Sequence, residues 1–227
     1  MEVAPGIHKI DGVTANSYLV VDGKESILID TGMPRSGRKI IDYISDYLKM
    51  SPGDVRHVVL THHHVDHAGG ASELKERLAG TKLVVHRADA DFVSGRSRPP
   101  TPAGAAGVML RALSPLMRYR RVSPDLEVGE GDSVGRLTVI HLPGHTPGSM
   151  ALHDPRTGAL FVGDALGTKD GRIRGPPKRF TADMKSATTS IHKLSELKFD
   201  ILLCGHGQPV KEGASAKVRE FYNSSIA

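Results

Sequence analysis

Apolar residues in the first thirty positions fall into short runs divided by polar turns, a pattern typical of β-strands. It predicts three strands, at 7–10, 17–21 and 26–30. Asp22-Gly23-Lys24 is predicted to be a hairpin turn between the last two strands. The period then changes. Between Ser36 and Met50 the apolar residues recur at helical intervals, and Ser51-Pro52-Gly53 ends the predicted helix.

The remainder of the chain alternates apolar runs with helical patterns, which predicts an α/β protein. Further strands are expected at 57–60, 82–85, 136–142, 149–153, 159–162 and 199–203. Helices are expected at 71–78, 87–93, 183–197 and 217–222. The order yields two similar halves, about 1–95 and 123–227, which we interpret as parts of a single domain spanning 1–227.

Two segments interrupt this order. Residues 94–122 begin with a Pro-, Gly- and Arg-rich stretch and continue into a helical pattern at 105–119. We predict an insertion that forms either a lid or a surface excursion, since long loops in compact domains are often functional. Residues 164–180 are predicted to be a second long loop.

Composition narrows the function classes. The chain has 227 residues, of which 39% are hydrophobic, and no apolar run approaches the roughly 20 residues of a membrane helix. With no signal-peptide pattern, a cytoplasmic location is expected. Cys204 follows the apolar run Ile201–Leu203 and is interpreted as a buried strand residue. A net charge of +5 and 4% aromatic residues argue against a nucleic-acid partner and suit a small substrate, including an anionic one.

Histidine is the residue type that points to chemistry. Directly after the strand predicted at 57–60 comes Thr61-His62-His63-His64-Val65-Asp66-His67, a His-x-His-x-Asp-His arrangement. Imidazole nitrogens and carboxylate oxygens bind zinc and similar divalent ions. In an extended chain, side chains two residues apart point to the same side, so His62 and His64 can bind one ion. His63 is expected to point away.

Asp66 and His67, where the loop turns into a helix, can point at a second ion beside the first. These four ligands do not fill two metal sites, and three further candidates follow other predicted strands. They are His145, Asp164 and His206, each beside a glycine. Asp30, in Asp30-Thr31-Gly32, is expected to accept an N–H from a ligand histidine or a loop amide.

This ordered set resembles the metallo-β-lactamase-fold hydrolases over about residues 5 to 210. The resemblance implies a four-layer αββα sandwich made of two similar halves. It also implies that one metal ion is held by His62, His64 and His145. A second ion would be held by Asp66, His67 and His206, with Asp164 bridging the two.

The resemblance implies a hydrolase with two divalent ions, zinc in the first place and iron or manganese as alternatives. A metal-bridging hydroxide would attack the substrate, and Asp66 would orient it and pass a proton to the leaving group. We expect thioester, lactone or other ester substrates. The alternatives are an iron oxidoreductase of the persulfide dioxygenase type and a small phosphodiesterase or nuclease. The natural substrate, the metal and the oligomeric state are left open by the sequence.

Overall fold

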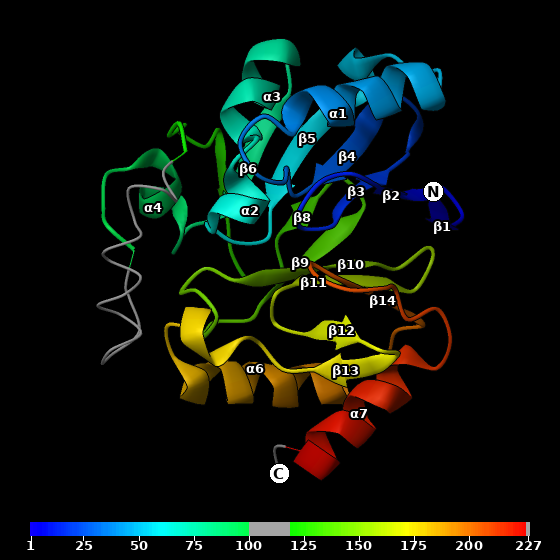
Figure 1. Cartoon of the computed structure of the whole chain (residues 1–227), viewed down its shortest axis with the longest axis vertical. Coiled ribbons are helices and arrows are strands. Elements are labelled where there is room, and N and C mark those ends of the chain that lie inside the picture. Colours follow the sequence, from blue (N-terminus) through cyan, green and yellow to red (C-terminus); the bar gives the residue numbers. More distant parts are fainter. Residues whose placement is uncertain (100–118, 226–227) are drawn as a thin grey trace. The chain divides into compact units, whose positions relative to one another are not determined.

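The structure, a computed structural model, describes residues 1–99 and 119–225 and consists of two compact units (Figure 1). The N-terminal unit comprises Met1–Arg98 and Tyr119–Val128, and the C-terminal unit includes Gly129–Ala227. These boundaries are close to those of the two predicted halves. Most of the predicted insertion at 94–122, with its helix, lies outside the described residues, so its role as lid or excursion stays a prediction.

The N-terminal unit is built on a seven-stranded sheet in which the strands lie in chain order. The strands are β1 (Glu2–Ala4), β2 (Ile7–Ile10), β3 (Ser17–Val20), β4 (Ser26–Ile29), β5 (Val55–Leu60), β6 (Lys82–His86) and β7 (Leu126–Val128). Strands β1 to β4 pair antiparallel, whereas β4 to β7 pair parallel. All four residues of β4 are buried, which explains its continuous apolar run.

Short helices follow the parallel strands of this unit. They are α1 (Gly37–Asp42), α2 (Val65–Ala68), α3 (Ala71–Arg77) and α4 (Ala90–Ser94), with 3-10 turns at Gly23–Glu25 and Pro52–Asp54. Helices α1 and α3 cover the same face of β4 and β5 (Figure 1). The single helix predicted from Ser36 to Met50 is wrong in detail, because α1 continues as a π-helical turn over Tyr43–Tyr47.

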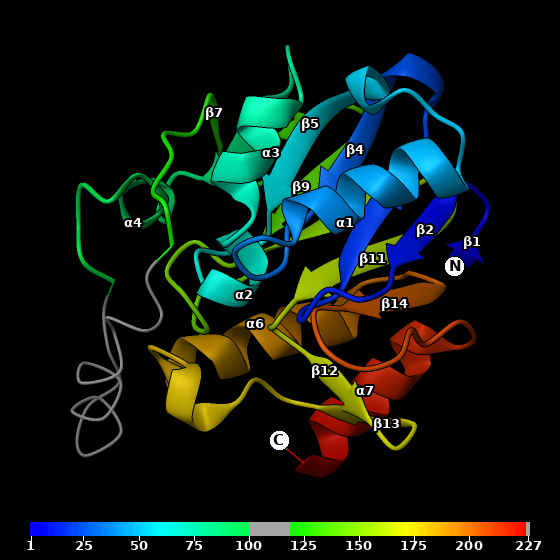
Figure 2. The same cartoon turned by 45° about the horizontal axis from the view of Figure 1, so that its top comes forward.

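The C-terminal unit has a five-stranded sheet in the order β14-β11-β10-β9-β8. Its strands are β8 (Ser133–Val134), β9 (Leu137–His141), β10 (Met150–Asp154), β11 (Ala159–Gly163) and β14 (Ile201–Cys204). Helices α6 (Met184–Glu196) and α7 (Ala214–Ser225) lie side by side under this sheet (Figures 1 and 2). Buried Leu160, Ile191 and Leu202 belong to the core between them.

A small hairpin corrects the prediction of a plain loop over 164–180. Strands β12 (Gly167–Lys169) and β13 (Arg172–Arg174) pair antiparallel, and a 3-10 turn follows at Lys178–Phe180. The connecting residues Asp170 and Gly171 have φ values of 52° and 73°. Two positive φ angles are the requirement of a type I′ turn, and Asp-Gly is a favoured sequence for it.

No helix among the described residues has the length and apolarity needed to cross a membrane.

Candidate metal centre

The first group of candidate ligands stands at one edge of the N-terminal sheet. Strands β4 and β5 are parallel neighbours, so Asp30, just after β4, comes close to the loop that follows β5. That loop carries His62 and His64, and the single turn of helix α2 then carries Asp66 and His67. The sequence pattern therefore marks a real change of direction, from strand through loop to helix.

The structure brings these four ligands together within the unit. One ligand atom of His62 lies within 4.8 Å of one from His64 and of one from His67. Asp66 Oδ2 lies 4.0 Å from His67 Nε2. His62 and His67 are buried, whereas the Asp66 side chain is 27% exposed. Asp66 is therefore partly open to solvent, whereas His62 and His67 are not.

Asp30 holds this loop in place as the sequence predicted. Its carboxylate is buried and accepts hydrogen bonds from the Thr61 amide at 2.8 Å and the Thr61 hydroxyl at 2.8 Å. His67 Nδ1 lies 2.7 Å from Asp30 Oδ2. Asp30 has a φ of 58°, an unusual conformation that aspartate tolerates better than most residues. One side chain therefore fixes both the strand end and a ligand ring.

Among the histidines of the loop after β5, His63 is not a candidate ligand, and it has a different hydrogen-bond partner. Its backbone amide donates to Asp89 Oδ2 at 2.9 Å, and its ring Nδ1 lies 2.8 Å from the same oxygen. The Tyr119 hydroxyl donates to the His63 carbonyl at 3.0 Å, and burial raises the pKa of Tyr119 to about 12. This buried His63–Asp89–Tyr119 cluster fixes the backbone between the two flanking ligands. Sequence alone missed it, because its members are far apart along the chain.

The second group of candidate ligands lies in the C-terminal unit, again at strand ends. Asp164 follows β11 and His206 follows β14, and these two strands are parallel neighbours. His145 lies in the turn between β9 and β10. Asp164 Oδ2 is 3.6 Å from His145 Nε2 and 3.5 Å from His206 Nε2. One carboxylate oxygen therefore faces the same ring nitrogen of both histidines.

Hydrogen bonds assign the same tautomer to three of the histidines. The Thr61 hydroxyl donates to Asp30, so at 3.1 Å it accepts from His62 Nδ1. The Thr181 hydroxyl donates to the Pro177 carbonyl, so at 3.2 Å it accepts from His145 Nδ1.

Asp30 likewise accepts from His67 Nδ1. A proton on Nδ1 leaves the Nε2 lone pair as the metal-binding atom, as in well-characterised zinc sites.

The donor set and its spacing fit a divalent metal. Two ligands of one tetrahedral ion, each bonded at about 2.0–2.1 Å, stand roughly 3.4 Å apart. The distances around Asp164 are 3.5 and 3.6 Å, close to this value. Cys204 belongs to none of the groups of candidate ligands that lie close together among the described residues. Burial, and then the Asp164 carboxylate, raise the pKa of its thiol far above the usual range.

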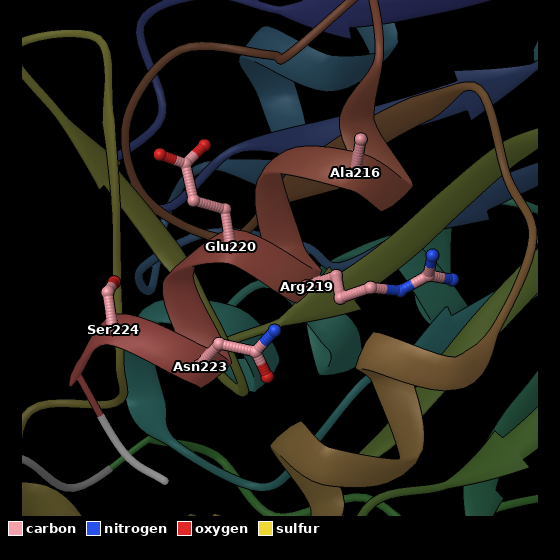
Figure 3. Close-up of a pocket in the computed structure, with 5 residues that line it drawn as sticks. All are labelled: Ala216, Arg219, Glu220, Asn223 and Ser224. Carbon is pink, nitrogen blue, oxygen red and sulfur yellow. The ribbon is translucent and has the colours of Figure 1, made fainter.

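A depression on the C-terminal unit adjoins the candidate ligands. It has a volume of about 290 Å³ and is lined by Asp164 and His206 together with Lys169, Arg174 and Pro177. A further depression, of about 470 Å³, is lined by residues of helix α7 (Figure 3). Figure 3 shows these side chains directed away from the helix, and none is a candidate ligand.

Comparison with known proteins places the chain in a family. The model of the metallo-beta-lactamase superfamily matches residues 10–206. The chain belongs to the metallo-β-lactamase superfamily. A crystal structure of a family member from Thermus thermophilus shares 22% identity, with a TM-score of 0.73 over 98% of this chain and 80% of that chain. The crystal structure of BJP-1, a subclass B3 metallo-β-lactamase of Bradyrhizobium japonicum, has a TM-score of 0.71 and shares 22% identity. The match covers 99% of this chain and 89% of that chain. The predicted α/β fold class is thereby confirmed.

Curated relatives agree with this assignment. The probable metallo-hydrolase YflN of Bacillus subtilis is 30% identical over 92% of this chain and 86% of its own. The human acyl-coenzyme A thioesterase MBLAC2 is 29% identical over 68% of this chain and 59% of its own. The protein is a metal-dependent hydrolase of this superfamily, whose members act on small molecules.

Proposed function

We propose that the ligands of both units act together to hold two divalent metal ions, zinc in the first place. One ion would be held by His62, His64 and His145, and the other by Asp66, His67 and His206, with Asp164 shared. The observation that carries this proposal is the common tautomer of three buried histidines, in which Nδ1 donates to the protein and Nε2 remains for a metal. The near-equal distances from Asp164 Oδ2 to two histidines support its shared role.

We propose further that the protein hydrolyses a thioester, lactone or other ester bond in a small molecule. It would act in the cytoplasm, as a single catalytic domain spanning 1–227. The bound ions would lower the pKa of an attacking water and polarise the carbonyl oxygen of the substrate. Asp66, partly open to solvent, would orient that water and carry its proton to the leaving group. Asp30 and Thr181 would keep His67 and His145 in the required tautomer.

Among these substrates the thioester has the strongest support. The relative MBLAC2 is named an acyl-coenzyme A thioesterase, although the chain spans only 59% of the length of that human protein. The lactone and simple ester remain the next members of the assay panel.

Elemental analysis of the purified protein, followed by activity assays, tests the proposal. We expect two zinc ions per chain, loss of thioesterase activity on chelation, and recovery when zinc is restored. The variant His206→Ala should lose one ion, whereas the exposed His192→Ala should retain both. A single iron per chain with oxygen consumption would favour the dioxygenase alternative. Full turnover by chelated protein would refute the metal-dependent mechanism.

A further inference from the structure

The two faces of the β12–β13 hairpin differ in chemistry. Side chains alternate along a strand, so Lys169, Arg172 and Arg174 share one face and Thr168 and Ile173 share the other. Thr168 is anchored, since its amide donates to the His206 carbonyl at 3.1 Å and its hydroxyl to the Gln208 carbonyl at 2.7 Å. Ile173 packs against the core of the C-terminal unit. The cationic face is therefore the one left for solvent or a ligand.

The charges on that face are arranged at a cost to stability. Lys169 and Arg172 are directly opposite each other across the hairpin, and like charges in this position repel. In the part of the chain that the structure describes, no acidic group forms an ion pair with Lys169, Arg172 or Arg174. An uncompensated cluster of this kind is expected where a negatively charged ligand supplies the missing partner.

The same hairpin borders the depression beside the candidate ligands. Lys169 and Arg174 line its wall, and Asp164 and His206 line it as well. Gly167 is opposite Arg174, so the strand facing the arginine carries no side chain there. The pocket, of about 290 Å³, is large enough for a carboxylate or phosphate group with its water.

Tight packing fixes the hairpin relative to His206. Gly207 has a φ of +94°, and a Cβ there would lie 2.0 Å from the Thr168 carbonyl oxygen. The Thr168 hydroxyl oxygen would lie 2.2 Å from the same Cβ, so Gly207 is in close contact with both the backbone and the side chain of Thr168. This contact and the two hydrogen bonds of Thr168 hold the backbone of β12 against the turn that carries His206.

We propose that Lys169 and Arg174 form a binding site for an anionic group of the substrate, remote from the bond that is cleaved. This inference rests on the proposed hydrolase function and narrows it to substrates with a carboxylate or phosphate. Arginine binds either group through paired N–H donors, and lysine adds a point charge. The anionic group anchors the substrate while the reacting carbonyl lies toward Asp164 and His206.

Three thioesters with the same acetyl group test this site. Acetyl-coenzyme A carries phosphates, S-acetylglutathione carries carboxylates, and S-acetyl-N-acetylcysteamine is neutral. The double variant K169Q/R174Q removes the proposed anion site. The double variant K178Q/R179Q removes equal charge from the same segment but not from the pocket wall. The zinc-loaded full chain is used throughout.

We expect wild-type protein to favour at least one anionic thioester over the neutral one by about tenfold or more in kcat/KM. K169Q/R174Q should lose that preference with little change toward the neutral thioester, and K178Q/R179Q should retain it. Which anionic thioester is favoured distinguishes phosphate from carboxylate. Equal rates on all three thioesters, or a preference unchanged in K169Q/R174Q, would overturn the inference.

A binding measurement separates this inference from the proposed reaction. If zinc-loaded protein cleaves none of the three thioesters, thioesterase function fails, and calorimetry with chelated protein still tests the anion site. Acetyl-coenzyme A or S-acetylglutathione should then bind wild-type protein about tenfold more tightly than K169Q/R174Q, and less tightly as ionic strength rises. Absence of binding, or equal binding by both proteins, would contradict the anion site.

Discussion

Replacing Asp30 by asparagine should weaken metal binding by about 10- to 100-fold without unfolding the protein. The side chain is buried, and its Oδ2 accepts from both the Thr61 hydroxyl and His67 Nδ1. An asparagine oxygen can still accept from the Thr61 amide, but its NH2 group then faces the His67 ring. Asparagine, like aspartate, tolerates the positive φ at this position, so backbone strain is not introduced.

The magnitude follows from the hydrogen bond that is lost. A hydrogen bond to a buried charged group contributes about 1.5–3 kcal/mol, and tenfold in affinity corresponds to about 1.4 kcal/mol. Facing a donor, His67 would shift its proton from Nδ1 to Nε2, the nitrogen that a metal requires. The cost of restoring the proper tautomer appears directly as weaker binding.

The assay is competition for zinc against a chelator of known affinity, with circular dichroism to confirm the fold. Asp42→Asn serves as the control, since it removes the same charge from an exposed residue that pairs with Arg38 along helix α1. Asp42→Asn should bind zinc as the wild type does. Wild-type zinc affinity in Asp30→Asn would refute the assigned role of Asp30 and the tautomer argument with it.

Two further substitutions test packing and charge. Gly207→Ala should lower the free energy of unfolding, measured by urea denaturation, by about 1–3 kcal/mol, because the new Cβ would clash with the Thr168 carbonyl. Gly213→Ala is the control and should cost less, because a Cβ at Gly213 would enter open space. Burial favours protonation of Asp154, but hydrogen bonds led by that from Arg136 outweigh it and lower its pKa. The ionised Asp154 carboxylate therefore stabilises the folded protein. Its contribution is fully present above the ordinary aspartate pKa and is lost as pH falls through the lowered pKa of the folded state. Arg136→Gln should therefore cost about 3 kcal/mol at pH 7 and less at pH 3, and an equal cost at both would contradict the pairing.

Sequence predicted most of the framework because the core positions repeat with the period of their element. The strand at 57–60 and the helix at 183–197 correspond closely to β5 and α6. Strand ends also located the candidate ligands in each unit, since side chains just after parallel neighbours meet at one sheet edge. Asp30 was predictable in role, although the identity of its histidine partner required the structure.

The sequence failed where the informative partner is distant or the pattern is polar. Residues 167–174 appear as a loop because only Ile173 among them is a large apolar residue, even though Asp170-Gly171 is a hairpin signal. The pairing of His63 with Asp89 joins a loop to the beginning of another helix, and no local period records it. Such contacts depend on tertiary structure alone.

The single cysteine provides a built-in reporter for one strand. Cys204 is 1% exposed and belongs to β14, an edge strand of the C-terminal sheet, two residues before His206. A thiol reagent can modify it only when that strand opens, because the buried thiol is both inaccessible and protonated. The rate of alkylation therefore measures local opening at the edge of the sheet, with no engineered label, and zinc bound by His206 should slow it.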